Sequence, residues 1–253
     1  SWQQPIAASC GWQLCGAKVT MASGNTSKAY DASEGYTDDE DPAFSAVFPL
    51  SSKTLAYGMD FEDIAVFTEA GHARDHVGML ATYGFVTFKG LHMLLSAAVA
   101  RLRPKNLGLP LSDALAGLHF LDLGSGDGRA VIGAAILAPD LAGSCGIELS
   151  TARHKLAIKN KEKLPQAVHE IVQFEQCDIL QFDAAQLGTT DIVYLANLRF
   201  PDETVEAINA KLDRECASDR DAVVATLREC VFSRPHIAWT EVVPMNWNVD
   251  GCP

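Results

Sequence analysis

The sequence predicts an α/β fold built on a parallel, doubly wound β-sheet. The first observation is an alternation, from about residue 119 onward, between short apolar runs of strand length and longer segments whose apolar residues recur at helical spacing. The second is a glycine-rich turn at residues 124–128, directly after the first of these apolar runs. In doubly wound sheets, a turn of this kind is where a ligand approaches the backbone.

The expected strands are short and are bounded by turn residues. They cover residues 119–123, 144–149, 170–175, 191–195, 222–227 and 236–245, and the helices between them cover residues 130–138, 151–164 and 202–212. Upstream, a helix is expected over residues 87–103, because apolar residues recur at helical spacing until Pro104 stops it. One or two further helices are expected within residues 60–78.

This distribution divides the chain into two parts. Residues 1–45 are poorly periodic and rich in small and polar residue types. We expect residues 1–110 to form a smaller, mainly helical N-terminal region that includes a lid over the site. We expect residues 111–253 to form an α/β domain that carries the ligand site.

The composition narrows the classes of partner. The chain has 253 residues and a formal net charge of −12. A domain that binds nucleic-acid phosphates needs a basic face, so this charge argues against direct nucleic-acid binding. The acidity suits a basic partner better, although it can also simply aid solubility. No apolar run reaches the roughly 20 residues of a membrane-spanning helix, so no membrane partner is expected. The seven cysteines form no C-x-x-C pair, so we expect reduced thiols and no metal site, with zinc at Cys10 and Cys15 disfavoured.

The glycine-rich turn has the spacing D-x-G-x-G-x-G, beginning at Asp122 and including Gly124 and Gly126. A dinucleotide site needs G-x-G-x-x-G, and here Arg129 stands where the last glycine should be. An acid at the strand end can hold an ammonium group, and the glycines leave room for a ribose and an amino-acid chain. The turn therefore predicts a site for S-adenosylmethionine, in preference to a nicotinamide dinucleotide.

Two further acids follow neighbouring strands. Glu148 ends the second strand, where an acid accepts hydrogen bonds from ribose hydroxyls. Asp178 follows the third strand and is placed to accept the adenine amino group, while Ile179 covers the ring. A strand-end acid by itself is more often a surface residue, and it is the preceding turn that favours the binding roles.

The acceptor side of the site is predicted from residues after the fourth strand. Asn197 is expected beside the methyl group, and Phe200 and Trp247 could wall a channel for an amine. Core packing is the alternative for either aromatic residue. An amine acceptor must arrive neutral, and an apolar channel with one or two polar groups would favour that form.

Over residues 80–250 the sequence resembles the disruptor-of-telomeric-silencing family, the non-SET histone H3 lysine methyltransferases. The resemblance is carried by TYGFVT at 82–87, DLGSGDG at 122–128, GIE at 146–148, YLANLRF at 194–200 and PMNW at 244–247. The chain departs from the family at Phe85, where the family has Glu, and at Ala196, where it has the first Asn of a pair.

The resemblance implies roles for residues that the pattern alone does not assign. Thr82, Tyr83, Gly84 and Thr87 would close over the methionine end of the cofactor, with Tyr83 near the reacting atoms. Asn197 would contact the cofactor and orient the acceptor amine. The family fold is Rossmann-like with a seventh, antiparallel strand beside the sixth, and no segment for that strand is visible, which suggests a trimmed chain or a strand supplied in another way.

The resemblance also implies a function. It is transfer of a methyl group from S-adenosylmethionine to a lysine of nucleosomal histone H3 in the nucleus, leaving S-adenosylhomocysteine and using no metal. Contact with nucleic acid would be indirect, through the nucleosome, and the acidic surface would attract basic histone tails. The alternatives are methylation of RNA or of a small molecule, which shares the same cofactor half, and a cofactor-binding scaffold without activity.

Overall fold

The computed structural model describes residues 14–19, 41–49, 61–72, 85–216, 221–228, 230, 232–233 and 236–241. A seven-stranded sheet with strand order β4-β3-β2-β5-β6-β1-β7 forms its centre, and every pairing in it is parallel. The strands are β1 (Leu14–Val19), β2 (His119–Leu123), β3 (Gly143–Glu148), β4 (Val172–Gln176), β5 (Ile192–Leu195), β6 (Ala222–Thr226) and β7 (His236–Glu241).

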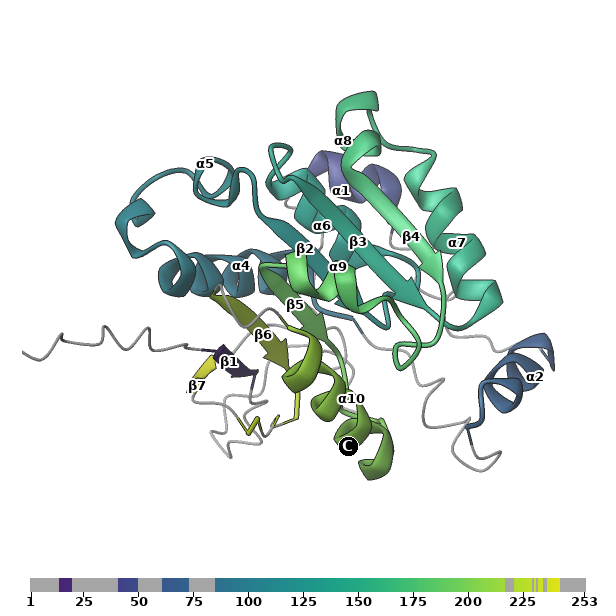
Figure 1. Ribbon diagram of the computed structural model, residues 1–253. Helices are drawn as coiled ribbons and strands as arrows, with labels where there is room; N and C mark the ends of the chain where they lie inside the picture. Colours follow the sequence, from purple (N-terminus) through teal and green to yellow (C-terminus); the bar gives the residue numbers. More distant parts are fainter. Residues whose placement is uncertain are drawn as a thin grey trace, which may run out of the picture.

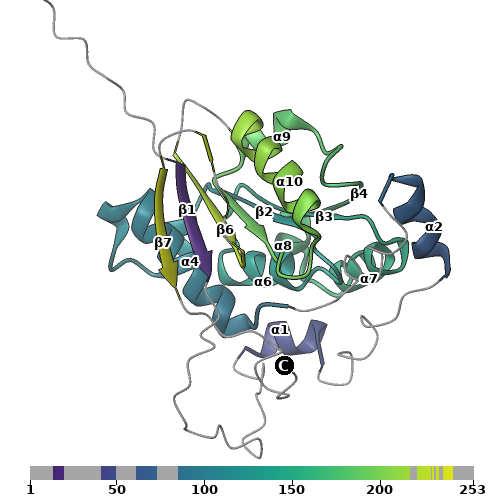
Figure 2. The same cartoon turned by 90° about the horizontal axis from the view of Figure 1, so that it is seen from below.

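Helices cover both faces of this sheet, which is why its central strands are continuous apolar runs. Figure 2 shows α9 and α10 on one face and α1, α4, α6 and α7 on the other. The helices are α1 (Pro42–Val47), α2 (Phe61–Glu69), α4 (Phe88–Leu102), η2 (Pro104–Asn106, a 3₁₀ turn), α5 (Leu111–Leu115), α6 (Arg129–Leu137), α7 (Thr151–Lys161), α8 (Gln166–Ile171), α9 (Ala184–Thr189) and α10 (Asp202–Glu215). Within the described ranges, no helix is long and apolar enough to cross a membrane.

The chain direction across the sheet reverses between β2 and β5. From β2 the chain steps outward to β3 and β4, and it then returns to the other side of β2 for β5 and β6 (Figure 1). In open parallel sheets, ligands bind outside the carboxyl ends of the strands at such a switch point. The predicted α/β fold is therefore confirmed, and the switch point lies at the predicted glycine-rich turn.

The helices of the first 110 residues share the hydrophobic core of the sheet. Phe44 of α1 packs against Phe88 of α4 with ring centroids 4.6 Å apart, and both belong to the same buried cluster as Phe120 of β2. Gly133 of α6 makes this packing close, because a Cβ there would lie 2.7 Å from the Leu91 side chain. The boundary expected at residues 110 and 111 thus runs through one continuous core, whereas α2 lies apart from it.

The N-terminal strand β1 was not expected from the sequence. It lies between β6 and β7 and pairs in parallel with both. Leu14 lies opposite Ala222 of β6, and Val19 lies opposite Glu241 of β7. The place beside β6 is therefore filled from the other end of the chain, in a parallel and not an antiparallel direction.

Candidate active site

The glycine-rich turn leaves β2 and enters α6 through three glycines in left-handed backbone conformations. Gly124, Gly126 and Gly128 have φ values of 94°, 56° and 87°. An L side chain is strained in this region of φ, and at Gly128 a Cβ would also lie 2.5 Å from the Phe174 ring. A Cβ at Gly124 would point toward Phe200, 3.7 Å away, so its absence opens the floor of a pocket.

Glu148, at the carboxyl end of β3, holds this turn in place. Its side chain is buried, Oε2 accepts a hydrogen bond from the Gly126 N–H and Oε1 accepts one from the Ser150 N–H, both at 2.8 Å. A carboxylate oxygen can accept more than one hydrogen bond. The predicted ribose-binding acid therefore lines the pocket as an acceptor suited to hydroxyl donors.

Asp178 follows β4 and also lines the pocket, as does Ile179. Its Oδ1 accepts a hydrogen bond from the Leu180 N–H at 2.8 Å, and its Oδ2 lies 3.2 Å from Nε2 of His72. Burial raises the pKa of this carboxyl, but the hydrogen bonds from His72 and Leu180 outweigh it and leave the pKa below its ordinary value. The carboxylate is thus held ionised, as an acceptor of hydrogen bonds.

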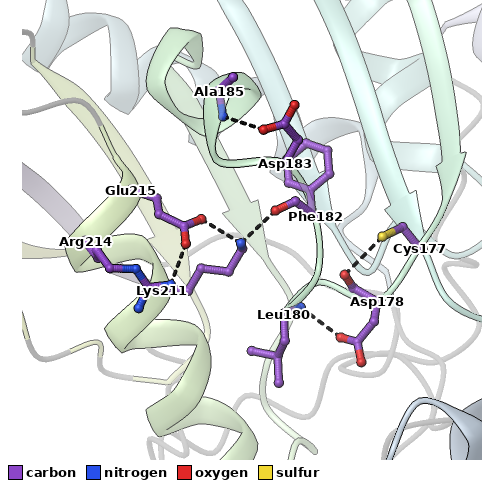
Figure 3. Close-up of polar contacts among 9 residues, drawn as sticks. All are labelled: Cys177, Asp178, Leu180, Phe182, Asp183, Ala185, Lys211, Arg214 and Glu215. Atoms are coloured by element: carbon purple, nitrogen blue, oxygen red, sulfur yellow. Dashed lines mark hydrogen bonds and ion pairs between the residues drawn. The ribbon is translucent and has the colours of Figure 1, made fainter.

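A buried lysine fixes the loop that carries Asp178, as Figure 3 shows. Lys211 reaches from α10 and donates a hydrogen bond from Nζ to the Phe182 carbonyl at 2.7 Å. The same ammonium lies 2.6 Å from Oε2 of Glu215, one turn further along α10. The loop is closed at its other end by hydrogen bonds from the Gln181 and Phe182 N–H groups to the Asp178 carbonyl.

Replacing Lys211 by methionine should therefore disturb both stability and the pocket. The variant leaves the Phe182 carbonyl without this donor in a buried setting, at a cost of about 1–3 kcal/mol in the free energy of unfolding. We also expect weaker binding of S-adenosylhomocysteine, since the loop bearing Asp178 loses its anchor. Urea unfolding and calorimetric titration measure the two effects, with the exposed Lys89→Met as control; parent-like values for both would contradict this anchoring role.

The pocket lies outside the carboxyl ends of β2, β3 and β4. It is partly open to solvent, and its empty space is about 680 Å³ when the open part is included. Its lining combines polar groups at one side with apolar side chains: Phe67, His72, Gly124, Ile147, Glu148, Leu149, Arg153, Asp178, Ile179, Leu180, Ala196, Phe200, Thr204 and Ile208. A few convergent polar groups among apolar walls are typical of a small-molecule site. The lining brings together four of the predicted cofactor residues, Gly124, Glu148, Asp178 and Ile179, but not Asp122, Gly126 or Asn197.

Four buried polar atoms at the ends of β2 and β5 have no hydrogen-bond partner among the residues that the structure describes. They are Oδ1 of Asp122, Oγ of Ser125, the hydroxyl of Tyr194 and Nδ2 of Asn197. Asp122 and Tyr194 are register partners on neighbouring strands. Because unsatisfied buried polar groups are costly, such a cluster indicates that a polar ligand completes it.

Asp122 has the environment expected of a carboxylate that awaits a cation. Burial raises its pKa well above the ordinary value, and the nearby charges of Glu148 and Asp127 raise it further. An ammonium group placed here would offset that repulsion. The expected roles of Asp122 toward the amino group, Glu148 toward the ribose and Asp178 toward the adenine of S-adenosylmethionine stay predictions.

An Asp122→Asn variant should separate binding from stability. A raised pKa means that the folded state holds this proton more tightly than the unfolded state, so Asp122 lowers stability as pH rises above about 4 toward the raised pKa. The variant should therefore lose less stability than the parent between about pH 5 and about pH 8. It should also bind S-adenosylhomocysteine at least about tenfold more weakly. Urea unfolding at the two pH values and calorimetry test this, and unchanged affinity would refute the ammonium role.

Asn197 lies just beyond β5 and is fully buried. Its Oδ1 accepts hydrogen bonds from the Leu227 N–H at 3.1 Å and the Arg228 N–H at 2.8 Å, which ties the end of β5 to the end of β6. Both lone pairs of the amide oxygen are thereby used. Only Nδ2 is left for a ligand, so the predicted contact with an acceptor amine would need a different geometry from the one seen here.

The other predicted site residues fall into two groups. Phe200 lines the pocket and packs against Phe67, and Thr87 caps α4 by accepting a hydrogen bond from the Gly90 N–H at 2.9 Å. The remaining four lie outside the described residues, and their roles stay predictions: Thr82, Tyr83, Gly84 and Trp247.

The structure gives the departure at Phe85 a physical setting. Arg129, buried at the start of α6, places its guanidinium carbon 4.3 Å from the Phe85 ring centre and 4.6 Å from that of Phe48. Its Nε donates a hydrogen bond to Oδ2 of Asp127 at 3.0 Å. The aromatic ring of Phe85 thus packs on the buried guanidinium of Arg129, the residue that replaces the last glycine of a dinucleotide motif.

Comparison with known proteins gives partial similarities. No family model matches the chain, and no curated protein does. An RNA methyltransferase from Salinibacter ruber, solved with S-adenosyl-L-homocysteine, is 30% identical over 47% of this chain and 67% of its own, with a TM-score of 0.34. Magnesium protoporphyrin IX methyltransferase from Synechocystis PCC 6803, solved with bound SAM, is 22% identical over 66% of this chain and 76% of its own, with a TM-score of 0.38.

A third solved structure, a precorrin-6y C5,15-methyltransferase from Geobacter metallireducens, is 18% identical over 52% of this chain and 60% of its own, with a TM-score of 0.36. The strand order, the switch point and the polar groups around it come from this chain itself. By these features the chain has the Rossmann-like fold of class I methyltransferases, and its pocket fits S-adenosylmethionine.

Proposed function

We propose that this protein is an S-adenosylmethionine-dependent methyltransferase. The observation that carries the proposal is the meeting of Gly124, Glu148 and Asp178 in one pocket, beside the unpartnered carboxylate oxygen of Asp122. Glu148 matches the ribose, Asp178 the adenine and Asp122 the ammonium group of the cofactor, while Gly124 leaves room for it. Among the described residues no group of His, Cys, Asp and Glu could hold a metal ion, and the proposal needs none.

In methyl transfer from this cofactor, the main task of the protein is to position the two reactants. When bound, the cofactor supplies an activated methyl group on a positively charged sulfur. The chain's own residues would hold its nucleoside end through Glu148 and Asp178 and keep water from the buried edge of β2 and β5. Such positioning can account for a large share of a rate enhancement.

A histone H3 lysine is the first acceptor that we propose. The support is the sequence resemblance at 194–200 together with the charge of the chain, −12, which suits a basic partner. An open groove beside Phe200 is lined by Asp202 and Glu203 as well as by Arg199 and Arg228. Asp202 is paired there with Arg228, so the support comes from the charge of the whole chain and not from this groove. A histone substrate would place the protein in the nucleus.

An RNA or a small molecule is the second candidate, and the hydrogen bonds of Asn197 favour it. Its amide oxygen is fully used by the backbone of residues 227 and 228, so it cannot also accept an N–H from a lysine amine. The cofactor half of the site is the same for either acceptor. Between these two, the acidity of the chain suits a small molecule better than a polymer of phosphates.

Parallel incubations with labelled S-adenosylmethionine test both proposals. Nucleosomes, free histone H3, total RNA and a small-molecule extract serve as acceptors, with the weaker-binding Asp122→Asn variant as a control that should transfer less label at limiting cofactor. Label on histone H3, mapped by mass spectrometry, would support the lysine proposal, and label on RNA or small molecules alone would overturn it. Binding of S-adenosylhomocysteine without transfer to any acceptor would indicate a scaffold.

A further inference from the structure

The segment formed by α2 and the three residues after it, up to His72, lies against the pocket, although it precedes the α/β domain in the chain. Figure 1 shows α2 beyond the carboxyl ends of β3 and β4, next to α7. Phe67 of α2 is 4% exposed and packs with Ile64, Leu149 and Phe200. The segment therefore covers the side of the pocket where the ends of β3 and β4 present their acids.

His72 is held in a defined position within this segment. Its backbone N–H donates to the Phe67 carbonyl at 3.0 Å, and its ring centroid lies 6.0 Å from that of Phe67. Its side chain is 12% exposed, and Nε2 lies 3.2 Å from Oδ2 of Asp178. His72 is thus bonded to the end of α2 through its backbone and to Asp178 through its ring, which joins this segment to the loop after β4.

We propose that His72 and Phe67 belong to the nucleoside-binding site, with His72 as the residue that positions the Asp178 carboxylate for the adenine. The inference rests on the proposed function, because it takes the pocket to hold S-adenosylmethionine. Oδ1 of Asp178 is directed by the Leu180 N–H and Oδ2 by His72, so the carboxylate is fixed from two sides. One lone pair on each oxygen stays available for the amino group of a purine.

Phe67 contributes the apolar half of the same wall. An adenine ring is flat and apolar on both faces, and Ile179 already lies in the lining, on the segment after β4. Phe67 and Phe200, in contact with each other, extend that apolar surface from α2 and from the segment after β5. The N-terminal region would then take part in recognition of the cofactor, with residues 61–72 as its contribution.

Calorimetric titration with S-adenosylhomocysteine tests the proposal without need of an acceptor. We expect about tenfold weaker binding for His72→Ala and for Phe67→Ala. His72→Gln keeps an N–H donor near Asp178 and should recover part of the loss, which a merely structural role would not predict. Glu69→Ala, exposed on the same helix, is the matched control and should bind as the parent does.

Hydrogen exchange provides a second measurement on the same proteins. S-adenosylhomocysteine should slow exchange of the amides of residues 66–72 in the parent and less so in His72→Ala. Parent-like or tighter binding by His72→Ala would overturn the inference. The inference would also be overturned if S-adenosylhomocysteine did not change hydrogen exchange in residues 66–72 of the parent. Failure of the parent itself to bind would instead refute the proposed function.

Discussion

Replacing Arg129 by methionine should lower the free energy of unfolding by about 3–5 kcal/mol, the usual cost of removing one partner from a buried ion pair. Arg129 and Asp127 are 2% and 1% exposed, and Nε lies 3.0 Å from Oδ2. Methionine keeps much of the side-chain volume but removes the guanidinium from the Asp127 carboxylate and from the rings of Phe48 and Phe85. Urea unfolding monitored by circular dichroism measures the change.

A double-mutant cycle separates the ion pair from the loss of packing. Asp127→Asn alone should also be destabilising, and the pair Asp127→Asn with Arg129→Met should lose clearly less than the sum of the two single changes. Additive losses would show that the two side chains do not interact, and a loss below about 1 kcal/mol for Arg129→Met would contradict the expected burial cost.

Glu148→Ala should impair both folding and cofactor binding. The variant leaves the Gly126 and Ser150 N–H groups without the carboxylate that accepts from them, at a cost of about 1–3 kcal/mol for each buried donor. It also removes the acceptor for the ribose hydroxyls, so binding of S-adenosylhomocysteine should weaken by about 10- to 100-fold.

The milder Glu148→Gln keeps the binding prediction testable if the alanine variant does not fold. Glutamine can accept one of the two backbone hydrogen bonds, so it should fold and still bind more weakly than the parent. Glu206→Ala, exposed on α10, is the control for loss of a carboxylate. Unchanged calorimetric affinity in Glu148→Gln and in a folded Glu148→Ala would refute the ribose role.

The sequence predicted the parts of the fold in which a local pattern and tertiary burial agree. The strand at 119–123 has the predicted bounds, and the helix expected over 87–103 is α4, Phe88–Leu102. Both are apolar over their buried positions and end at clear turn residues. The short helices α1, α5, α8 and α9 were not expected, because five or six residues are too few for a helical period to emerge.

The β1 strand could not be predicted for a different reason. Residues 14–19, LCGAKV, show no strict alternation, and their pairing depends on strands at the other end of the chain. In contrast, the acids at the strand ends could be predicted, because parallel strands bring their carboxyl ends to one edge of the sheet. His72 and Phe67 belong to no motif, and only the fold brings them to that edge, 106 residues before Asp178 in the case of His72.

The placement of β1 has a consequence for the order in which the protein can fold. β1 pairs with β6 on one side and with β7 on the other. β7 therefore joins the sheet only after β1 has paired with β6. Leu14 and its partner Ala222 are roughly 200 residues apart, and closing so long a loop is slow and entropically costly. β1 therefore waits for β6 to form, β7 adds after it, and until β1 inserts, β6 presents an open edge to which another chain could add.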